Sequence, residues 1–379
     1  MTGAAAFLDR VADFAAGPVR AGAAGWSMGE TPAPELFAEA ARIGILSVSI
    51  PAKLGGAGFG FATLLRACEI LAAEDFGFAM SLVNTHNVAL RLCRSAPPDL
   101  LAKHLPGLLS GATAACTALT EPGAGSDFAA ITSHATPGGD GWHLSGEKTW
   151  IINARRAGLA VVFAHCGTPA GARSIGGFVV DLTQPGVTRH PIDSAFAQTS
   201  MGTGRLTFDH VALPPEALIL PPGGAFKSIM VELNAARTYV AAMCNAMTRT
   251  ALSEAAQYGT ERHSFGTPLA AHQAWRIALV QAETDLAGAE ALTAQAAAQI
   301  DAGEDAQLSA ARAKIAATDC AQHHLPHLLH AMGAEGLRPT RCFTRHLAAA
   351  QIAALTDGTT TMLRERVARL TLPRTDTRE

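Results

Sequence analysis

An unusual turn, Thr-Glu-Pro-Gly-Ala-Gly-Ser-Asp at residues 120–127, combines hydroxyls, two carboxylates and two glycines directly after an apolar run. Glycine lets a backbone approach a ligand closely, and the hydroxyls of Thr120 and Ser126 can donate hydrogen bonds to a polar ring or a carbonyl. Few structural requirements would select this combination. The turn is therefore interpreted as a loop that cradles a ligand.

Three histidines form a second pattern that could do chemistry. His323, His327 and His330 are spaced i, i+4, i+7, so they share one face of a predicted helix and could ligate zinc. Pro326 is expected to kink that helix, and no acidic group that would orient the ligands is evident. We therefore predict no metal site.

Three stretches of different periodicity must position these residues. Residues 1–115 are mainly helical, with breaks at Gly-Gly and Pro-Pro pairs. Residues 116–222 carry short β-branched or aromatic runs between Gly, Pro and Asp turns, which predicts a small β-domain or barrel. Residues 223–379 return to the helical period, with an apolar stripe between Trp275 and Ala289, and predict a helix bundle. The predicted fold class is α+β, in the order α, β, α.

Composition sets limits on partners and location. The chain has 379 residues, 49% of them hydrophobic, and can bury a sizeable core. Its net charge of -3 does not favour binding to nucleic acid or to an anionic membrane. It also has no apolar run long enough for a transmembrane helix. Asp9 and Asp13 interrupt the opening segment where a signal peptide would be apolar, so a cytoplasmic location is expected.

Seven cysteines are scattered along the chain without any Cys-x-x-Cys spacing. An odd number at irregular intervals does not form a disulfide framework or a metal motif. We expect reduced thiols, most of them buried.

The turn at 120–127, with Ala118 and Leu119 before it, resembles the signature of the acyl-CoA dehydrogenase family of flavoproteins. Further matches follow in the family's order: Glu-Arg-His-Ser-Phe-Gly-Thr-Pro-Leu at 261–269, Gly-Ala-Glu-Gly at 333–336, and Asp-Gly-Thr-Thr at 357–360. Pro-Ala-Lys-Leu-Gly-Gly-Ala-Gly at 51–58 resembles another family segment. The resemblance covers nearly the whole chain. It implies an N-terminal α-helical domain, a middle β-barrel domain and a C-terminal four-helix bundle, assembled as a homotetramer or homodimer.

The family chemistry implied by this resemblance removes hydrogen from the α and β carbons of an acyl thioester. A base takes the α-proton and the β-hydrogen leaves as hydride to N5 of FAD. The family's base is the Glu of a Glu-Gly-Thr segment, which makes Asp357 the candidate here. By itself, an aspartate in such a turn would more simply cap the helix that follows, at Thr360 or Thr361.

Aspartate in place of glutamate is the departure that matters most for the mechanism. It is shorter by roughly 1.5 Å, and a misplacement of about 1 Å can cost around a hundredfold in rate. Members of the family that act on cyclic acyl thioesters resemble this chain in using Asp, so a cyclic, branched or short acyl group is kept open. Burial beside an apolar acyl chain is expected to raise the pKa of Asp357.

The resemblance also implies a cofactor-binding set and a substrate-binding set. The FAD contacts are Thr120, Ser126, Trp150, Arg262, Phe265, Gln273, His330, Gly333 and Thr359, and the substrate contacts are Ser126, Asn234, Arg237 and Gly358. Ile152 stands where Ser or Thr usually touches flavin N5, and His330 and Ala334 replace a Gln and a Gly. We expect weakened rather than absent FAD binding. Asn234 stands where an acidic residue is common.

Three functions remain open from the sequence. The first is an FAD-dependent acyl-CoA dehydrogenase that passes electrons to an electron-transfer flavoprotein. The second is a catalytically altered or silent subunit that binds an acyl thioester within a heteromer. The third, indicated only by Ile152, is a flavin oxidase or hydroxylase on the same scaffold. The length and branching of the acyl chain, and the choice between coenzyme A and acyl carrier protein, are not encoded in these motifs.

Overall fold

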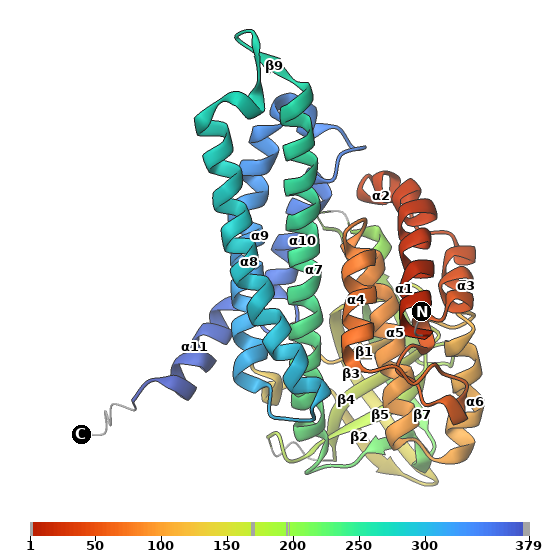
Figure 1. Ribbon diagram of the computed structural model, residues 1–379. Coiled ribbons are helices and arrows are strands. Elements are labelled where there is room, and N and C mark those ends of the chain that lie inside the picture. Colours follow the sequence, from red (N-terminus) through yellow and green to blue (C-terminus); the bar gives the residue numbers. More distant parts are fainter. Residues whose placement is uncertain (1–2, 168–170, 195, 197, 374–379) are drawn as a thin grey trace. The chain divides into compact units, whose positions relative to one another are not determined.

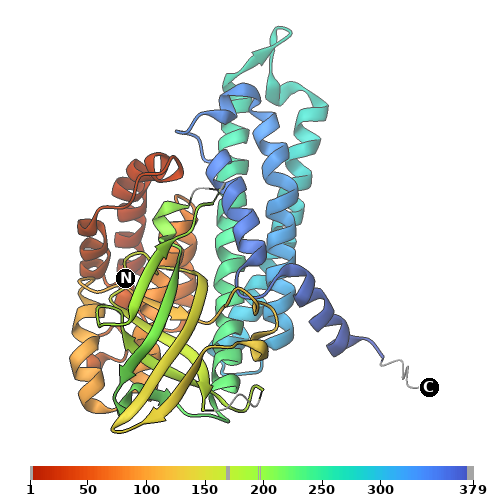
Figure 2. The same ribbon diagram turned by 180° about the vertical axis from the view of Figure 1, so that it is seen from behind.

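The computed structural model describes residues 3–167, 171–194, 196 and 198–373 (Figures 1 and 2). The chain divides into two compact units. The first comprises Met1–Ala67 and Gly77–Met230, and the second comprises Cys68–Phe76 and Val231–Glu379. The predicted α+β class, with helical, β and helical segments in that order, is confirmed. The exact boundaries at 115/116 and 222/223 stay predictions.

The helical part of the first unit packs around aromatic rings. Its helices are α1 (Gly3–Phe14), α2 (Arg20–Ser27), α3 (Pro34–Ile43), α4 (Phe61–Ala72), α5 (Phe76–Ser95) and α6 (Pro98–Leu109), with a π-helical turn at Ala15–Val19. Proline occupies the first turn of α3 and of α6, where its missing N–H costs nothing. The Phe78 ring lies 5.2 Å from those of Trp26 and Phe37, measured between centroids. These rings join three helices that are distant in sequence.

A single eight-stranded sheet forms the β-part of the first unit. The strands are β1 (Ala115–Ala118), β2 (His134–Gly138), β3 (Gly141–Ile151), β4 (Leu159–Cys166), β5 (Ile175–Asp181), β6 (Val187–Pro191), β7 (Gly204–Leu213) and β8 (Leu218–Leu220). Their order is β6-β7-β3-β2-β4-β5-β8, with β1 parallel to β4. Strand β4 is buried on both faces from Leu159 to His165, which explains its continuous apolar run.

The second unit is an alanine-rich helix bundle. Most of α7 (Ala225–Glu261) belongs to it, with α8 (Gln273–Asp301), α9 (Gln307–Ala331), α10 (Phe343–Leu355) and α11 (Thr360–Thr371). In Figure 1, α7 to α10 lie side by side and α11 extends from the bundle. The predicted stripe on α8 is buried at Leu279, Ala282, Leu286 and Ala289. Small alanine side chains let neighbouring backbones approach closely.

Pro326 and the cysteines can be compared with the expectations from the sequence. Helix α9 continues as one element through Pro326, so the expected kink at this residue does not end the helix. All seven cysteines are free thiols, and five of them are buried, as predicted. In the part of the chain that the structure describes, no helix is long and apolar enough to span a membrane.

Asn153 joins three elements of the first unit just after β3. Its side-chain amide donates to the carbonyls of Ser81 at 2.8 Å and Ala115 at 2.9 Å. Its oxygen accepts from Ser81 Oγ and Arg156 Nη2, both at 2.7 Å. The residue is fully buried and has a positive φ of 67°. Asparagine tolerates this left-handed backbone better than most residues, so one side chain satisfies both the turn and its neighbours.

Replacing Asn153 with Ala should lower the stability of the protein by about 1–3 kcal/mol, because buried groups on Ser81, Ala115 and Arg156 lose their partner. Thermal or urea unfolding measures the change. The neighbouring Arg155→Ala is the control, since Arg155 is exposed. An unfolding midpoint equal for both variants would contradict this account of the turn.

Candidate active site

The turn at 120–127 is closed by its own backbone. The N–H of Glu121 donates to the carbonyl of Ala124 at 3.0 Å, and the N–H of Ala124 returns a bond at 3.1 Å. Thr120, which follows β1, is partly exposed and Ser126 is exposed. Both hydroxyls are therefore accessible to solvent, and the role of the turn as a cradling loop stays a prediction.

Glu121 is not a ligand-facing acid but the anchor of this turn. Its carboxylate lies 2.7 Å from Lys148 Nζ, and both side chains are buried. It also accepts backbone N–H bonds from Thr132 at 2.6 Å and Ser133 at 3.0 Å. Burial raises the pKa of Glu121, but the charge and hydrogen bond of Lys148 and the bonds from Ser133 and Thr132 outweigh it and lower the pKa to about 2.

Trp150 lies beside the turn on strand β3. The N–H of Thr149 donates to the carbonyl of Thr120 at 2.9 Å, which fixes the two segments together. The pairing of β3 with β7 shifts register between Lys148 and Ile151. Trp150 takes a φ of 57° at this irregularity and leaves its side chain 58% exposed. A large aromatic ring held open to solvent beside two hydroxyls is suited to packing against a planar polar ring.

Ile152 follows Trp150 and is partly exposed. Its side chain has no donor, so it cannot bond a ring nitrogen. The structure thus keeps the aromatic and hydroxyl members of the predicted flavin set on one loop–strand junction, without the usual donor two residues after the tryptophan.

The second unit holds Asp357 in a tight turn between α10 and α11. Asp357 and Gly358 have consecutive positive φ values of 54° and 96°. Arg237 Nε donates to the carbonyl of Asp357 at 3.1 Å. Lys314 Nζ donates to the carbonyls of Thr356 and Gly358. Two buried cations therefore hold three successive carbonyls of this turn.

The carboxyl group of Asp357 is left available for chemistry. Its Oδ2 is buried and has no hydrogen-bond partner among the described residues. Burial raises the pKa of Asp357, and the charges of Lys314 and Arg237 offset part of that rise. A buried carboxyl with a raised pKa and an open oxygen fits a general base.

The helix cap that competed with this interpretation is made by another residue. Thr359 precedes α11, and its hydroxyl accepts from the N–H of Met362 at 3.2 Å. The alternative in which Asp357 caps Thr360 or Thr361 is therefore wrong. The cap leaves the predicted FAD contact of Thr359 possible, because a hydroxyl that accepts one bond can still donate another.

The predicted substrate residues of the second unit gather behind the same turn. Arg237 Nη1 donates to Asn234 Oδ1 at 2.9 Å, and the Arg237 side chain is only 1% exposed. Gly358 has a φ of 96°, a backbone conformation that favours glycine at this position. Arg237 thus supports the turn of Asp357 directly; its predicted contact with substrate stays a prediction.

The remaining predicted cofactor residues lie at one end of the bundle. Arg262 is followed by a hairpin of β9 (His263–Ser264) and β10 (Thr267–Pro268), labelled in Figure 1. Phe265 at its tip is 97% exposed with a φ of 52°. Gln273 begins α8 and is exposed. The proposed contact of Phe265 with FAD stays a prediction.

His330 and Gly333 lie near this end. His330 is exposed in the last turn of α9, and Gly333 begins a 3₁₀ turn with a φ of 60°. Trp275 Nε1 of α8 donates to the carbonyl of Ala331 at 3.4 Å, which ties the start of α8 to the end of α9. The structure thereby brings Gln273 and the His330–Gly333 turn to the same end of the unit.

The histidine pattern shows no metal centre. The rings of His323 and His327 are 4.8 Å apart between centroids, and His324 rather than His330 makes an acidic contact, to Asp285 at 2.8 Å. No group of three or more potential ligands is assembled among residues 3–167, 171–194, 196 and 198–373.

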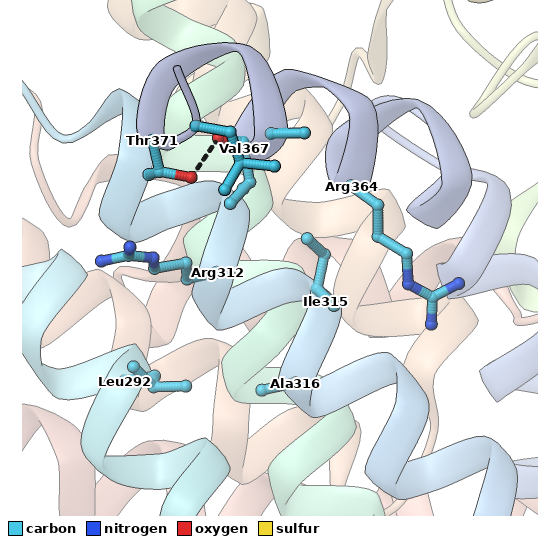
Figure 3. A pocket seen from close by; sticks show the side chains of 9 residues that line it. Leu292, Arg312, Ile315, Ala316, Arg364, Val367 and Thr371 are labelled. Carbon is cyan, nitrogen blue, oxygen red and sulfur yellow. Dashed lines mark hydrogen bonds between the residues drawn. The ribbon is translucent and has the colours of Figure 1, made fainter.

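A pocket on the second unit lies apart from this chemistry. It is formed between α8, α9 and α11 and is lined by apolar side chains such as Leu292, Ile315 and Val367, with Arg312 and Arg364 (Figure 3). The predicted site residues are not among those that line it.

Sequence reasoning missed two lysines that position these turns. Lys148 follows Glu147 in the mostly polar strand β3, so the local pattern did not mark it as buried. Lys314 stands between Ala313 and Ile315 in α9 and was the clearer candidate. Both lysines are 0% exposed, and a buried ammonium is costly unless it is paired.

Comparisons with known proteins agree along the whole chain. Models of the acyl-CoA dehydrogenase N-terminal, middle and C-terminal domains match residues 3–112, 116–211 and 223–372. The human mitochondrial short-chain specific acyl-CoA dehydrogenase is 31% identical over 85% of this chain and 78% of its own length. An acyl-CoA dehydrogenase of Mycobacterium tuberculosis is 30% identical over 80% of this chain and 79% of its own length. The butyryl-CoA dehydrogenase structure from Megasphaera elsdenii has a TM-score of 0.93 and 27% identity, covering 98% of this chain and 99% of that one.

A chain with this three-part fold and these motifs is a flavoprotein oxidoreductase. It belongs to the acyl-CoA dehydrogenase family, and its cofactor is FAD. The residues present fit that cofactor, because the exposed indole of Trp150 and the hydroxyl of Thr120 are fixed on one junction, and the exposed donors Arg262 and Gln273 suit a diphosphate and a nucleotide base.

Replacing Lys148 with Met should destabilise the protein by about 3–5 kcal/mol, because Glu121 becomes an unpaired buried charge. The matched control is Arg205→Met, which removes the half-exposed pair of Arg205 and Glu147 from the same sheet and should cost under about 1 kcal/mol. Urea unfolding at neutral pH measures both. Equal losses would show that the buried pair is not the anchor.

Acid should remove the same contribution from the wild type. Because the folded-state pKa of Glu121 is about 2, below its ordinary value of 4.5, and that of Lys148 is about 8, the ion pair stabilises the fold between about pH 4.5 and pH 8 and loses this effect as the pH falls toward 2. The difference in unfolding free energy between wild type and Lys148→Met, followed by acid titration, should shrink over that interval. A difference that is constant with pH would contradict the assignment.

Proposed function

We propose that this chain introduces an α,β double bond into a short acyl-CoA thioester, with Asp357 as the base that removes the α-proton. The observation that carries this proposal is the carboxyl group of Asp357. It has a raised pKa and an unpartnered buried oxygen, and its backbone is held by Arg237 and Lys314. A helix cap or a surface ion pair would need none of these features.

We assign separate roles to Asp357, Trp150, Thr120 and Ser126. Asp357 in its carboxylate form accepts the α-proton, and the fixed turn restricts the directions in which it can do so. Trp150 and Thr120 hold the flavin ring, while Ser126 binds the flavin or the thioester arm. Bound FAD supplies acceptance of the β-hydrogen as hydride.

A short acyl group is supported by two observations. The relatives named above are a short-chain specific acyl-CoA dehydrogenase and a butyryl-CoA dehydrogenase. Asp357 also has less reach than the family's glutamate, which a small or branched substrate can offset by lying closer to it. Gly358, Asn234 and Arg237 are proposed as substrate contacts.

The outer cofactor residues support an assembly of identical subunits. Arg262, Phe265 and Gln273 lie at the exposed end of the bundle and are proposed to bind FAD of a neighbouring subunit. His330, Gly333 and Thr359 are proposed as further FAD contacts. We propose a homotetramer or homodimer in the cytoplasm that passes electrons to an electron-transfer flavoprotein.

One departure favours a second candidate function. Ile152 provides no donor for flavin N5, and its apolar side chain would alter the access of oxygen there. The alternative is therefore a flavin oxidase or hydroxylase on the same scaffold. Oxygen consumption that matches substrate turnover would identify it, whereas anaerobic bleaching of the flavin with slow oxygen uptake supports the dehydrogenase.

Replacing Asp357 with Asn should abolish anaerobic flavin reduction by butyryl-CoA while FAD stays bound, because the amide cannot accept the α-proton. Stopped-flow absorbance measures the rate. The matched control is Asp319→Asn, since Asp319 is a half-exposed carboxylate paired with Arg364 at 2.7 Å. A reduction rate near wild type in the Asp357 variant would reject this residue as the base.

The pH dependence of flavin reduction should rise with pH through a pKa above the ordinary 3.8 of aspartate, since the base acts in its ionised form. Ionisation of Asp357 favours flavin reduction but lowers the stability of the fold. A carboxyl whose folded pKa is raised costs stability once the pH exceeds its unfolded pKa, so Asp357→Asn should melt no lower than wild type at neutral pH. A lower melting temperature would favour a structural role.

A further inference from the structure

We propose that Lys314 is a positioning residue of the active site, which fixes the turn that carries Asp357 and places a positive charge behind its carboxyl group. This inference rests on the proposed role of Asp357 as the base.

Lys314 contacts the backbone on both sides of Asp357. Its Nζ donates to the carbonyl of Thr356 before Asp357 and to the carbonyl of Gly358 after it. Arg237 of α7 holds the carbonyl between them. The lysine comes from α9, while the turn joins α10 and α11. Two helices outside the turn therefore determine its backbone.

The turn needs such outside support. Helix α10 ends at Leu355 and α11 begins at Thr360, so only four residues connect them. Asp357 takes a left-handed backbone with a φ of 54°, a conformation that residues other than glycine adopt less readily. Carbonyls that turn inward here also require donors. Lys314 supplies donors to two of them and so offsets the strain that aims the base.

The position of Lys314 is difficult to explain by packing. Its neighbours on α9 include Ala310, Ala311, Ala313 and Ala317, all buried. A buried ammonium in such surroundings is unfavourable, and an apolar side chain of similar length would fit them better. The contacts with the Asp357 turn provide the compensating interaction.

Charge gives Lys314 a second effect on the base. Burial raises the pKa of Asp357, and the positive charges of Lys314 and Arg237 lower it. Burial also lowers the pKa of Lys314 to about 8, partly opposed by Asp357 and Cys244 and reinforced by Arg237. Arg366 of α11 acts on Arg237 in turn. The charged and titratable groups around this turn are thus Arg237 and Cys244 from α7, Lys314 from α9 and Arg366 from α11.

Two variants separate donors from charge. Lys314→Gln keeps an amide donor group, on a side chain one bond shorter, and removes the charge, whereas Lys314→Met removes both the donors and the charge. Thr318→Val is the matched control one turn along α9, because Thr318 contacts Thr360 at the start of α11 through a hydroxyl and carries no charge. Thermal melts establish that each variant is folded, and Lys314→Gln alone decides the test if Lys314→Met does not fold.

The first measurement uses the FAD-loaded protein without substrate. Infrared titration of the protonated carboxyl band, with the Asp357→Asn spectrum subtracted, reports the pKa of Asp357. We expect an upward shift of about one unit or more in both Lys314 variants and no shift in Thr318→Val. An unchanged midpoint in Lys314→Gln and Lys314→Met would overturn the inference.

The second measurement is anaerobic flavin reduction by butyryl-CoA as a function of pH. Its apparent pKa should move upward in both Lys314 variants, and Lys314→Met should also lose maximal rate because the turn is released. A maximal rate near wild type in Lys314→Met would contradict the positioning role. Flavin reduction that persists in Asp357→Asn would reject the proposed function instead, and the infrared shift would still report on Lys314.

Discussion

Burial of a carboxyl group that must remain able to accept a proton is the constraint on which the proposed active site depends. A cation paired directly with Asp357 would lower its pKa strongly and occupy its oxygens. The structure avoids this by directing Lys314 and Arg237 to backbone carbonyls of the turn. The charges of Lys314 and Arg237 then offset part of the rise in the pKa of Asp357. The carboxyl oxygen Oδ2 of Asp357 has no hydrogen-bond partner among the described residues.

Glu121 shows the opposite arrangement of the same chemical groups. Its carboxylate pairs directly with Lys148 and accepts two backbone N–H bonds, so its pKa falls to about 2 and the group is ionised at neutral pH. Such a carboxylate is a poor base, but its contacts hold the loop in place. Two buried acid–lysine contacts thus have different roles, because one lysine reaches the carboxylate and the other reaches the backbone around it.

Backbone strain marks the predicted site residues more clearly than their side-chain types do. Among the described residues, five that are not glycine have a positive φ, and three of them are Trp150, Phe265 and Asp357. Each is held by its surroundings: a register shift in β3, a two-residue hairpin tip, and a turn clamped by cations. Strain persists where a structure fixes it, and it often accompanies functional geometry. The departures at Ile152, His330 and Ala334 leave these backbone features in place.

Local pattern determined much of this protein. Turn residues and periodicity predicted the helical, β and helical order, and cysteine spacing predicted the free thiols. The resemblance to the family identified the motifs that contain Thr120, Trp150 and Asp357, because each motif consists of residues close in sequence. The tertiary structure alone assigned the helix cap to Thr359, buried Glu121 against Lys148 27 residues away, and brought Lys314 to carbonyls 42 and 44 residues further on. The partner of a buried charge is set by the path of the chain through space, and no local sequence pattern records that path.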